Sequence, residues 1–346
     1  MAYTNINKPS DYFNTKLYTG NGSTQSITGI NFQPDMVWTK IRNGVYDHNI
    51  FDAIRGVTKD IRPNVTNAEG TQSGGLTSFD SDGYSLGSWV PVNESSSNYV
   101  SWNWLANGAG VSNTDGSITS TVSANTISGF SIVKYTGDAV SGATVGHGLG
   151  AVPKMVIIKS LDNAATPWVI YHASLGNTKK LYFDTASEAT TSNWASTSPT
   201  SSVFTISGSE PNASGENFIA YCFAEKKGFS KFGSYVGNGI ADGTFVYTGF
   251  KPAFVIQKHY SGAATEGWQM WDAKRNPYNL TDLNLSADMN GAEFTATARA
   301  IDILSNGFKC RGADNSGNAS GQGYIYMAFA ENPLVSSTGV PCTARW

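Results

Sequence analysis

Three sequence markers recur in the same order three times along this chain of 346 residues. The first is a tyrosine that ends an extended segment just before turn-forming residues. The second is a proline with a lysine six residues after it, and the third is an aromatic, strand-like run. The markers lie at 18–22, 34–40 and 99–104, at 135–138, 153–159 and 218–223, and at 235–239, 252–258 and 324–329. This recurrence predicts three diverged copies of one folding unit, joined end to end.

The pattern between the markers predicts strands. Short apolar runs alternate with turn residues, and no segment sustains a 3.6-residue period. Segments 79–84 and 304–308 are typical of two strands joined by a tight turn that contains glycine. Charged residues make up only 14% of the chain, whereas aromatic residues and glycine are plentiful. We therefore predict an all-β chain with little helix, built from three tandem antiparallel β-sandwich repeats of the jelly-roll or lectin type.

The markers also divide the chain into segments. Residues between the first two copies are rich in Ser, Thr, Gly and Asn, which is typical of a flexible linker. Aromatic residues at 229–234 predict a packed junction between the second and third copies. Terminal arms outside the markers often dock on neighbouring proteins in assemblies. The predicted segments are an N-terminal arm (1–17), repeat one (18–106), the linker (107–129), repeat two (130–228), repeat three (229–334) and a C-terminal arm (335–346).

Charge, hydropathy and cysteine spacing exclude several classes of function. The net charge of −3 comes without a basic cluster, so we expect no nucleic-acid partner. No apolar run is long enough to span a bilayer, and the first residues lack a signal-peptide pattern, so we expect no membrane insertion. Cys222, Cys310 and Cys342 are widely spaced, which predicts free, mostly buried thiols rather than disulfides or a zinc site.

Candidate ligand motifs have simpler explanations. The glycine-rich segment 146–150 precedes a strand, whereas a phosphate-binding loop precedes a helix. His48, His147, His172 and His259 occupy unrelated positions in the copies, so we expect surface or strand-end histidines and no metal site. We predict no metal and no cofactor.

Catalytic motifs are equally weak. Asp80 to Gly83 predicts a plain turn, because the rest of a calcium-binding loop is missing. No pair of carboxylates recurs across the copies, and no GxSxG motif occurs, so we predict a protein that is not an enzyme, with no catalytic residues. The acidic residues considered were Asp35, Asp80, Glu94, Glu216, Asp272 and Asp302.

Aromatic residues divide into core and loop positions. Trp104, Phe223 and Phe329 are equivalent positions of a strand, and Trp38 aligns with two isoleucines, so we expect all four in the core. Aromatic residues near loops are weaker candidates for binding, and we assign no ligand-binding residues. Those near loops are Trp89, Trp194 and Tyr260.

Several short runs carry a resemblance to a known family. They lie at 16–29, 32–35, 76–84, 145–150, 171–176 and 326–331. Together they resemble an uncharacterised repeat family that is common in virion proteins of tailed bacteriophages, particularly marine and cyanobacterial phages, and is often labelled tail fibre or structural protein. The resemblance covers nearly the whole chain. It implies a virion component made in the host cytoplasm, with β-sandwiches displayed on the particle, anchoring arms and no catalytic residues.

The resemblance leaves the position on the particle open. We expect a tail-fibre or receptor-binding adhesin, because linked weak sites gain avidity. The alternative is a capsid decoration, knob or cement protein. A polysaccharide depolymerase is the weakest of the three readings, because such enzymes usually show a long β-helix and this chain has no short solenoid repeat. The expected partners are other virion proteins and a host-surface glycan. We expect a homo-oligomer, with an internal pseudo-trimer within one chain as the alternative.

Overall fold

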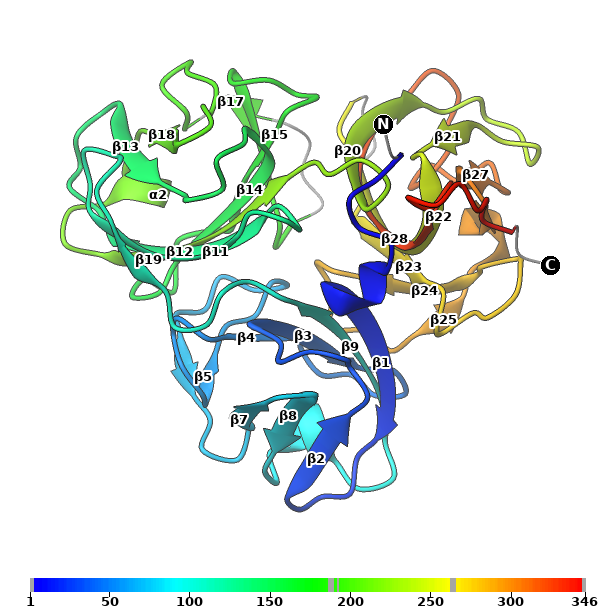
Figure 1. The fold of residues 1–346 in the computed structure, drawn as a ribbon, viewed down its shortest axis with the longest axis horizontal. Helices are drawn as coiled ribbons and strands as arrows, with labels where there is room; N and C mark the ends of the chain where they lie inside the picture. The colour runs from blue at the N-terminus through cyan, green and yellow to red at the C-terminus, as the bar shows by residue number, and fades with distance from the viewer. Residues whose placement is uncertain (1–2, 186–189, 192, 262–265, 344–346) are drawn as a thin grey trace.

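The structure is a computed structural model that describes residues 3–185, 190–191, 193–261 and 266–343. It contains 44% strand and 4% helix, which confirms an all-β chain with little helix. Figure 1 shows three lobes of antiparallel strands arranged around a common centre. The chain runs from the blue lobe to the green lobe and ends in the yellow-to-red lobe.

The first lobe contains two sheets, which we call the first sheet pair. Between them lies a core that includes Tyr18, Val37 and Tyr84. A two-stranded ribbon, β5 (Lys59–Asp60) with β6 (Gly70–Thr71), and the one-turn helix α1 (Val90–Asn93) lie in the connections. The larger sheet has the order β1 (Phe13–Thr19), β9 (Asn98–Trp104), β3 (Met36–Ile41) and β4 (Asn49–Asp52), and the smaller has β2 (Gln25–Thr28), β8 (Gly83–Leu86) and β7 (Leu76–Asp80).

The second sheet pair has a larger sheet of eight strands. Its core includes Tyr135, Val156 and Phe204. The one-turn helix α2 (Ser209–Asn212) precedes its closing strand. The larger sheet has the order β10 (Val111–Asn113), β11 (Ser120–Asn125), β12 (Phe130–Thr136), β19 (Asn217–Ala224), β14 (Pro153–Ser160), β15 (Val169–His172), β16 (Lys179–Tyr182) and β17 (Thr190–Thr191), and the smaller pairs β13 (Ala143–Gly146) with β18 (Val203–Ile206).

The third sheet pair has the same central order. Its core includes Tyr235, Val255 and Phe308. Two 3₁₀ turns, Pro9–Asp11 before β1 and Thr297–Arg299 before β26, complete the described elements. The larger sheet has the order β20 (Ser230–Val236), β28 (Gly323–Pro333), β22 (Phe250–His259), β23 (Trp268–Asp272), β24 (Leu283–Ser286) and β25 (Phe294–Thr295), and the smaller has β21 (Phe245–Tyr247), β27 (Gly307–Cys310) and β26 (Ile301–Leu304).

Strand register relates equivalent residues of the three sheet pairs. Trp38, Ile157 and Ile256 lie opposite Trp102, Tyr221 and Met327 respectively, so the strands that begin near the recurring prolines align residue by residue. The predicted strand-turn-strand segments are β7 with β8 and β26 with β27.

One central core joins the three lobes. Trp104, Phe223 and Phe329 belong to it, which confirms their predicted burial, and the Trp104 ring lies 6.5 Å from Phe223 and 5.7 Å from Phe329 between centroids. Phe229 and Phe232 of the predicted packed junction are also members. Because each larger sheet buries one face in its own sheet pair and the other in this centre, both faces carry apolar side chains. The first lobe is therefore packed directly against the other two and is not separated from them by a flexible linker.

The predicted linker is largely built into a sheet. β10 and β11 lie within 107–129, and β11 pairs along its whole length with β12. Val122 is buried in the core of the second sheet pair. The flexible-linker prediction failed because Ser and Thr residues on a strand at the sheet margin give the same composition as a free segment.

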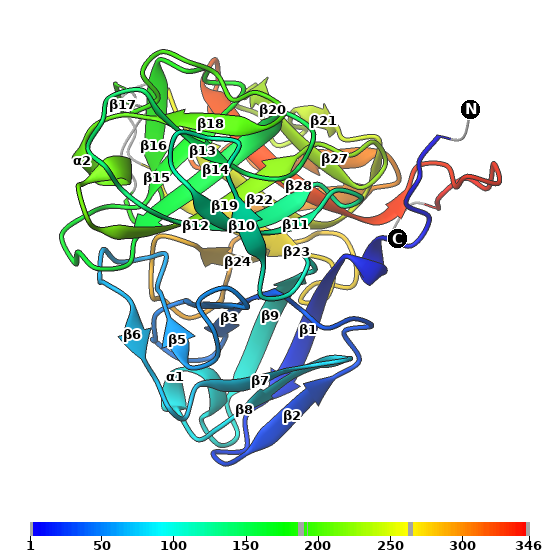
Figure 2. The ribbon, with the colours of Figure 1, turned by 60° about the vertical axis from the view of Figure 1, so that its left-hand side comes forward.

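The N-terminal arm is shorter than predicted, and it contacts the C-terminal arm. β1 begins at Phe13, which is buried in the central core, so the N-terminal arm ends before residue 17. Asn7 Nδ2 donates to Ser337 Oγ at 2.7 Å, and the Ser337 amide donates to Asn7 Oδ1 at 2.7 Å. Figure 2 shows the described parts of the two arms side by side at one edge of the molecule.

Candidate functional site

Each junction between lobes contains a ring nitrogen next to a backbone carbonyl of the neighbouring sheet pair. The three rings align, because they stand four residues before Asp52, His172 and Asp272. The three carbonyls also align, because each follows the residue opposite Ile50, Ile170 or Met270. The contacts are Trp168 Nε1 to Arg62 O (2.9 Å), Trp268 Nε1 to Tyr182 O (2.9 Å) and His48 Nε2 to Ser286 O (3.1 Å).

These contacts close into a cycle. The second sheet pair reaches the first, the third reaches the second, and the first reaches the third. Burial lowers the pKa of His48 well below its usual value, so its ring is neutral. Trp38 Nε1 donates to His48 Nδ1 at 3.0 Å, so the other nitrogen, Nε2, carries the hydrogen and donates to Ser286 O. His48 therefore donates a ring N–H to the neighbouring sheet pair, as Trp168 and Trp268 do at the other two junctions.

A second set of junction contacts surrounds two buried ion pairs. Arg55 Nε lies 2.5 Å from Asp52 Oδ2, and Arg275 Nε lies 2.5 Å from Asp272 Oδ2, with all four side chains fully buried. The equivalent positions in the second sheet pair hold His172 and Leu175, which do not form an ion pair. Each acidic or imidazole group also meets the next lobe, through Tyr221 OH to Asp52 (2.7 Å), Trp102 Nε1 to Asp272 (3.2 Å) and His172 Nε2 to Tyr326 O (3.2 Å).

The recurring lysine is buried in all three sheet pairs. Lys40 donates to the carbonyls of Ile41 (2.8 Å) and Gly44 (3.3 Å). Lys159 donates to those of Asn163 (3.2 Å) and Thr166 (2.9 Å). The Lys258 ammonium donates to a carbonyl of its own following loop in the same way. These lysines hold loops in place and do not face solvent.

Burial of these lysines predicts a rise in stability with pH. It lowers the pKa of both Lys40 and Lys159 from 10.5 to about 8, against an opposing effect of nearby carboxylates. Below pH 8 each lysine is protonated in both the folded and the unfolded state, so the folded state bears the full free-energy cost of burying the charge. Between pH 8 and 10.5 the unfolded state binds more protons, so each lysine raises the free energy of unfolding by roughly 1.4 kcal/mol per pH unit.

Urea unfolding of wild type, Lys40→Met and Lys159→Met at several pH values checks this. The difference between wild type and each variant should change across that interval, while the exposed Lys179→Met should leave it constant. A constant difference for all three variants would contradict the assignment.

A buried asparagine fixes the turn after each opening strand. Asn93, Asn212 and Asn318 each stand six residues before the aromatic residue that stacks on the first-marker tyrosine. This spacing is present in the sequence but is not one of the three markers. The bonds run from Asn21 N to Asn93 Oδ1 (2.9 Å), from Asp138 N to Asn212 Oδ1 (2.9 Å) and from Asn238 N to Asn318 Oδ1 (3.0 Å).

The marker glycine is required by the same turn. A Cβ atom at that position would approach a backbone carbonyl oxygen too closely in every sheet pair. The distances would be 2.2 Å at Gly20, 2.3 Å at Gly137 and 2.3 Å at Gly237.

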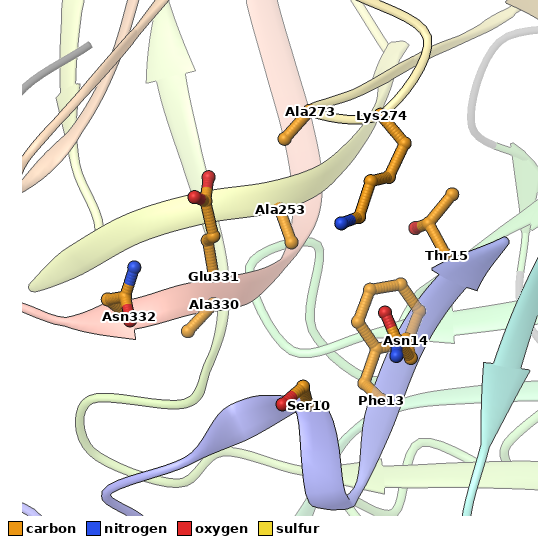
Figure 3. A pocket seen from close by; sticks show the side chains of 10 residues that line it. All are labelled: Ser10, Phe13, Asn14, Thr15, Ala253, Ala273, Lys274, Ala330, Glu331 and Asn332. Atoms are coloured by element: carbon orange, nitrogen blue, oxygen red, sulfur yellow. The ribbon is translucent and has the colours of Figure 1, made fainter. Parts of the chain in front are cut away.

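A cavity of about 280 Å³ lies where the first and third sheet pairs meet (Figure 3). Phe13, Asn14 and Thr15 of β1 line one side. Ala330 to Asn332 of β28, with Ala253 and Lys274, line the other. Both the Thr15 hydroxyl and the Lys274 ammonium point into the space between β1 and β28. No sequence pattern predicts this cavity.

The prediction that histidines lie at the surface is wrong. All four are at most 1% exposed, so none is a surface residue, although His172 and His259 do end strands. His147, in the glycine-rich segment 146–150, contacts Thr200 O through Nε2 (3.2 Å) and accepts the Leu149 amide at Nδ1 (3.2 Å). Among the described residues, no group of three or more His, Cys, Asp or Glu is placed to hold a metal ion.

Other candidates have structural roles. Asp80 accepts from the Ser78 and Ser85 hydroxyls and lies at the predicted turn between β7 and β8. Asp35 accepts the amides of Ala106 (2.7 Å) and Gly108 (3.0 Å), and burial raises its pKa to about 6. All three cysteines are free, and Cys222 and Cys310 are buried, as predicted.

The loop aromatics do not gather into one site. Trp194 is 2% exposed and packs in the core of the second sheet pair, so its consideration as a binding residue was wrong. Trp89 and Tyr260 are half-buried and pack against different clusters. No helix of the described residues is long and apolar enough to cross a membrane.

Comparison with known proteins gives one match. No curated protein and no solved structure matches the chain. A family model described as a domain of unknown function, DUF7483, matches residues 8–333, which is nearly the whole chain. The chain therefore belongs to the DUF7483 family.

Proposed function

We propose that the chain is a structural protein of a tailed-bacteriophage particle, and that it is a tail-fibre or receptor-binding adhesin. We further infer that its three sheet pairs are three tandem β-sandwich repeats, arranged as a single-chain pseudo-trimer. The observation that carries this inference is the cycle of equivalent contacts made by His48, Trp168 and Trp268. A cycle that closes after three steps needs no further subunit to complete it.

The closed arrangement suits a rigid binding head. Three lobes that share one core hold their outer loops at fixed separations, so every molecule presents the same arrangement of loops to a host surface. Host-surface glycan and other virion proteins are the proposed partners. We keep the proposed homo-oligomer and assign its contact to the terminal arms, which lie together at one edge through Asn7 and Ser337.

Competition for host cells tests the adhesin. Purified protein, added to host cells before phage, should slow phage adsorption in proportion to the amount bound, and heat-denatured protein should have no effect. Absence of both cell binding and competition would reject the adhesin proposal.

The alternative is a capsid decoration, knob or cement protein. The contact between the two arms favours this reading, because one protruding edge can bridge neighbouring subunits. An electron map of the virion separates the two: density at the tail supports the adhesin, whereas density on the head lattice supports decoration.

A further inference from the structure

Among the described residues, two of the three equivalent junctions carry a large apolar side chain at one position of the opening strand, and the third has the cavity there. Phe13, Phe130 and Ser230 lie opposite Trp104, Phe223 and Phe329, so Thr15, Ile132 and Phe232 are equivalent, two residues further along each strand. Large apolar side chains thus stand at this position in two sheet pairs, and a small hydroxyl stands there in the first. The residue after the recurring proline also differs, since Asp35 and Lys154 are replaced by Ala253 in the third sheet pair.

At the other two junctions, larger side chains occupy the positions equivalent to Thr15 and Ala253. Between the first and second sheet pairs, the Asp35 carboxylate accepts two amides of the passing chain, and Ile132 is fully buried. Between the second and third, Phe232 is buried in the central core, and Lys231 pairs with Glu225 at 2.8 Å. Between the third and first, Thr15 and Ala253 leave the cavity of about 280 Å³. The hollow therefore arises from two particular side-chain replacements.

Two buried polar atoms of residues that line the cavity lack hydrogen-bond partners. Thr15 is 5% exposed, and its Oγ1 has no hydrogen-bond partner. Oε2 of Glu331 is also buried without a partner. Buried polar atoms are normally satisfied, so these two atoms leave hydrogen-bonding capacity unused beside the cavity. The side chain of Asn332 also lines the cavity.

The charges favour an anionic ligand. Glu331 Oε1 is balanced by Lys251 at 3.3 Å. Lys274 has no carboxylate within ion-pair distance among the residues that the structure describes, and its ammonium points into the cavity. The charges of Lys251 and Glu331 cancel, so Lys274 contributes one net positive charge to the cavity. Typical ligand pockets begin at about 300 Å³, so this cavity accepts a single small ring rather than a chain of rings.

We propose that this cavity binds one acidic sugar residue, whose carboxylate pairs with Lys274 and whose hydroxyl groups bond to Thr15 and Glu331. The Phe13 side chain at the base gives the ring an apolar contact. This inference rests on the proposed adhesin function and names the ligand class for it. Affinity of the millimolar order is expected, because a single sugar ring makes few contacts.

Calorimetric titration of the full chain with methyl β-glucuronide tests the proposal. Methyl β-glucoside, which lacks the carboxylate, should bind about tenfold more weakly or worse, because a charge-assisted bond is lost. Acetate alone should also bind weakly, since it has no hydroxyl groups.

Three variants complete the test. Lys274→Met keeps the apolar stem and should weaken glucuronide binding about tenfold or more. Ala253→Leu, which fills the space, should abolish it, whereas Lys179→Met removes an equal charge from a distant exposed site and should leave it unchanged. Circular dichroism confirms that each variant is folded.

The outcomes separate this site from the adhesin proposal. No binding of the glucuronide by wild type, or binding that Lys274→Met and Ala253→Leu leave unchanged, overturns the site. If cells are bound and both variants bind them as well as wild type, the adhesin stands and the cavity does not carry it. If the glucuronide binds as expected but cells are not bound, the site stands and the adhesin proposal fails.

Discussion

Arg275→Leu is expected to lower the free energy of unfolding by about 3–5 kcal/mol, because it leaves the Asp272 carboxylate buried without its cation. Asp272 and Arg275 are both fully buried and 2.5 Å apart. Asp272 also accepts Trp102 Nε1 from the first sheet pair, so the damage should reach the junction. Urea unfolding measures the loss.

The second sheet pair supplies the control. It holds His172 and Leu175 where the third holds the ion pair, so the double variant Asp272→His, Arg275→Leu copies a combination that this chain already accommodates. Replacement of both partners avoids an unpaired buried charge, and the double variant should lose less stability than Arg275→Leu alone. A double variant that is less stable than the single one would contradict this account.

Trp104→Ala should lower the free energy of unfolding by about 3–5 kcal/mol, because it opens a void in the core shared by all three lobes. The Trp104 ring contacts Phe13, Phe130, Phe223, Phe254 and Phe329 at centroid distances of 4.9, 6.4, 6.5, 6.2 and 5.7 Å. Wild type should unfold in one transition, since no lobe can separate without exposing this centre.

Hydrogen exchange distinguishes shared from local damage. In Trp104→Ala, protection should fall together in β9, β19 and β28, which are the closing strands of the three sheet pairs. Phe204→Ala, whose side chain packs only in the core of the second sheet pair, should first affect β13 and β18. Exchange confined to β9 in Trp104→Ala would show that the lobes are not coupled through this residue.

Much of the fold was predictable because it depends on local repetition. Tyrosine, proline, lysine and the closing aromatics recur at nearly constant spacing, and the structure gives each the same position in its sheet pair. Trp38 and Trp104 were correctly predicted to be core residues from alignment between copies. The linker failed because a strand such as β11, with Ser, Thr and Asn on it, contains too few large apolar residues to be told from a free segment.

The junctions could not be predicted, because they depend on distant pairings. His48 meets Ser286, which is 238 residues away, and Tyr221 meets Asp52 across 169 residues. The histidines were expected at the surface because imidazole usually needs water, and here protein groups satisfy three of them. The lysine spacing was visible, but its burial depends on loop carbonyls that no pattern reveals. The cavity depends on which junction lacks a filling side chain.

A trimer of identical subunits must repeat every substitution at all three interfaces. Here the three interfaces are encoded separately, so Thr15 and Ala253 alter one of them while the other two keep their filling side chains. A single chain with three similar junctions can thus acquire an asymmetric feature at one of them without altering the contacts at the other two. It also sets a stoichiometry for the proposed sugar site: the described residues form one such cavity at the three junctions, so multivalent attachment by the proposed adhesin would require several molecules side by side.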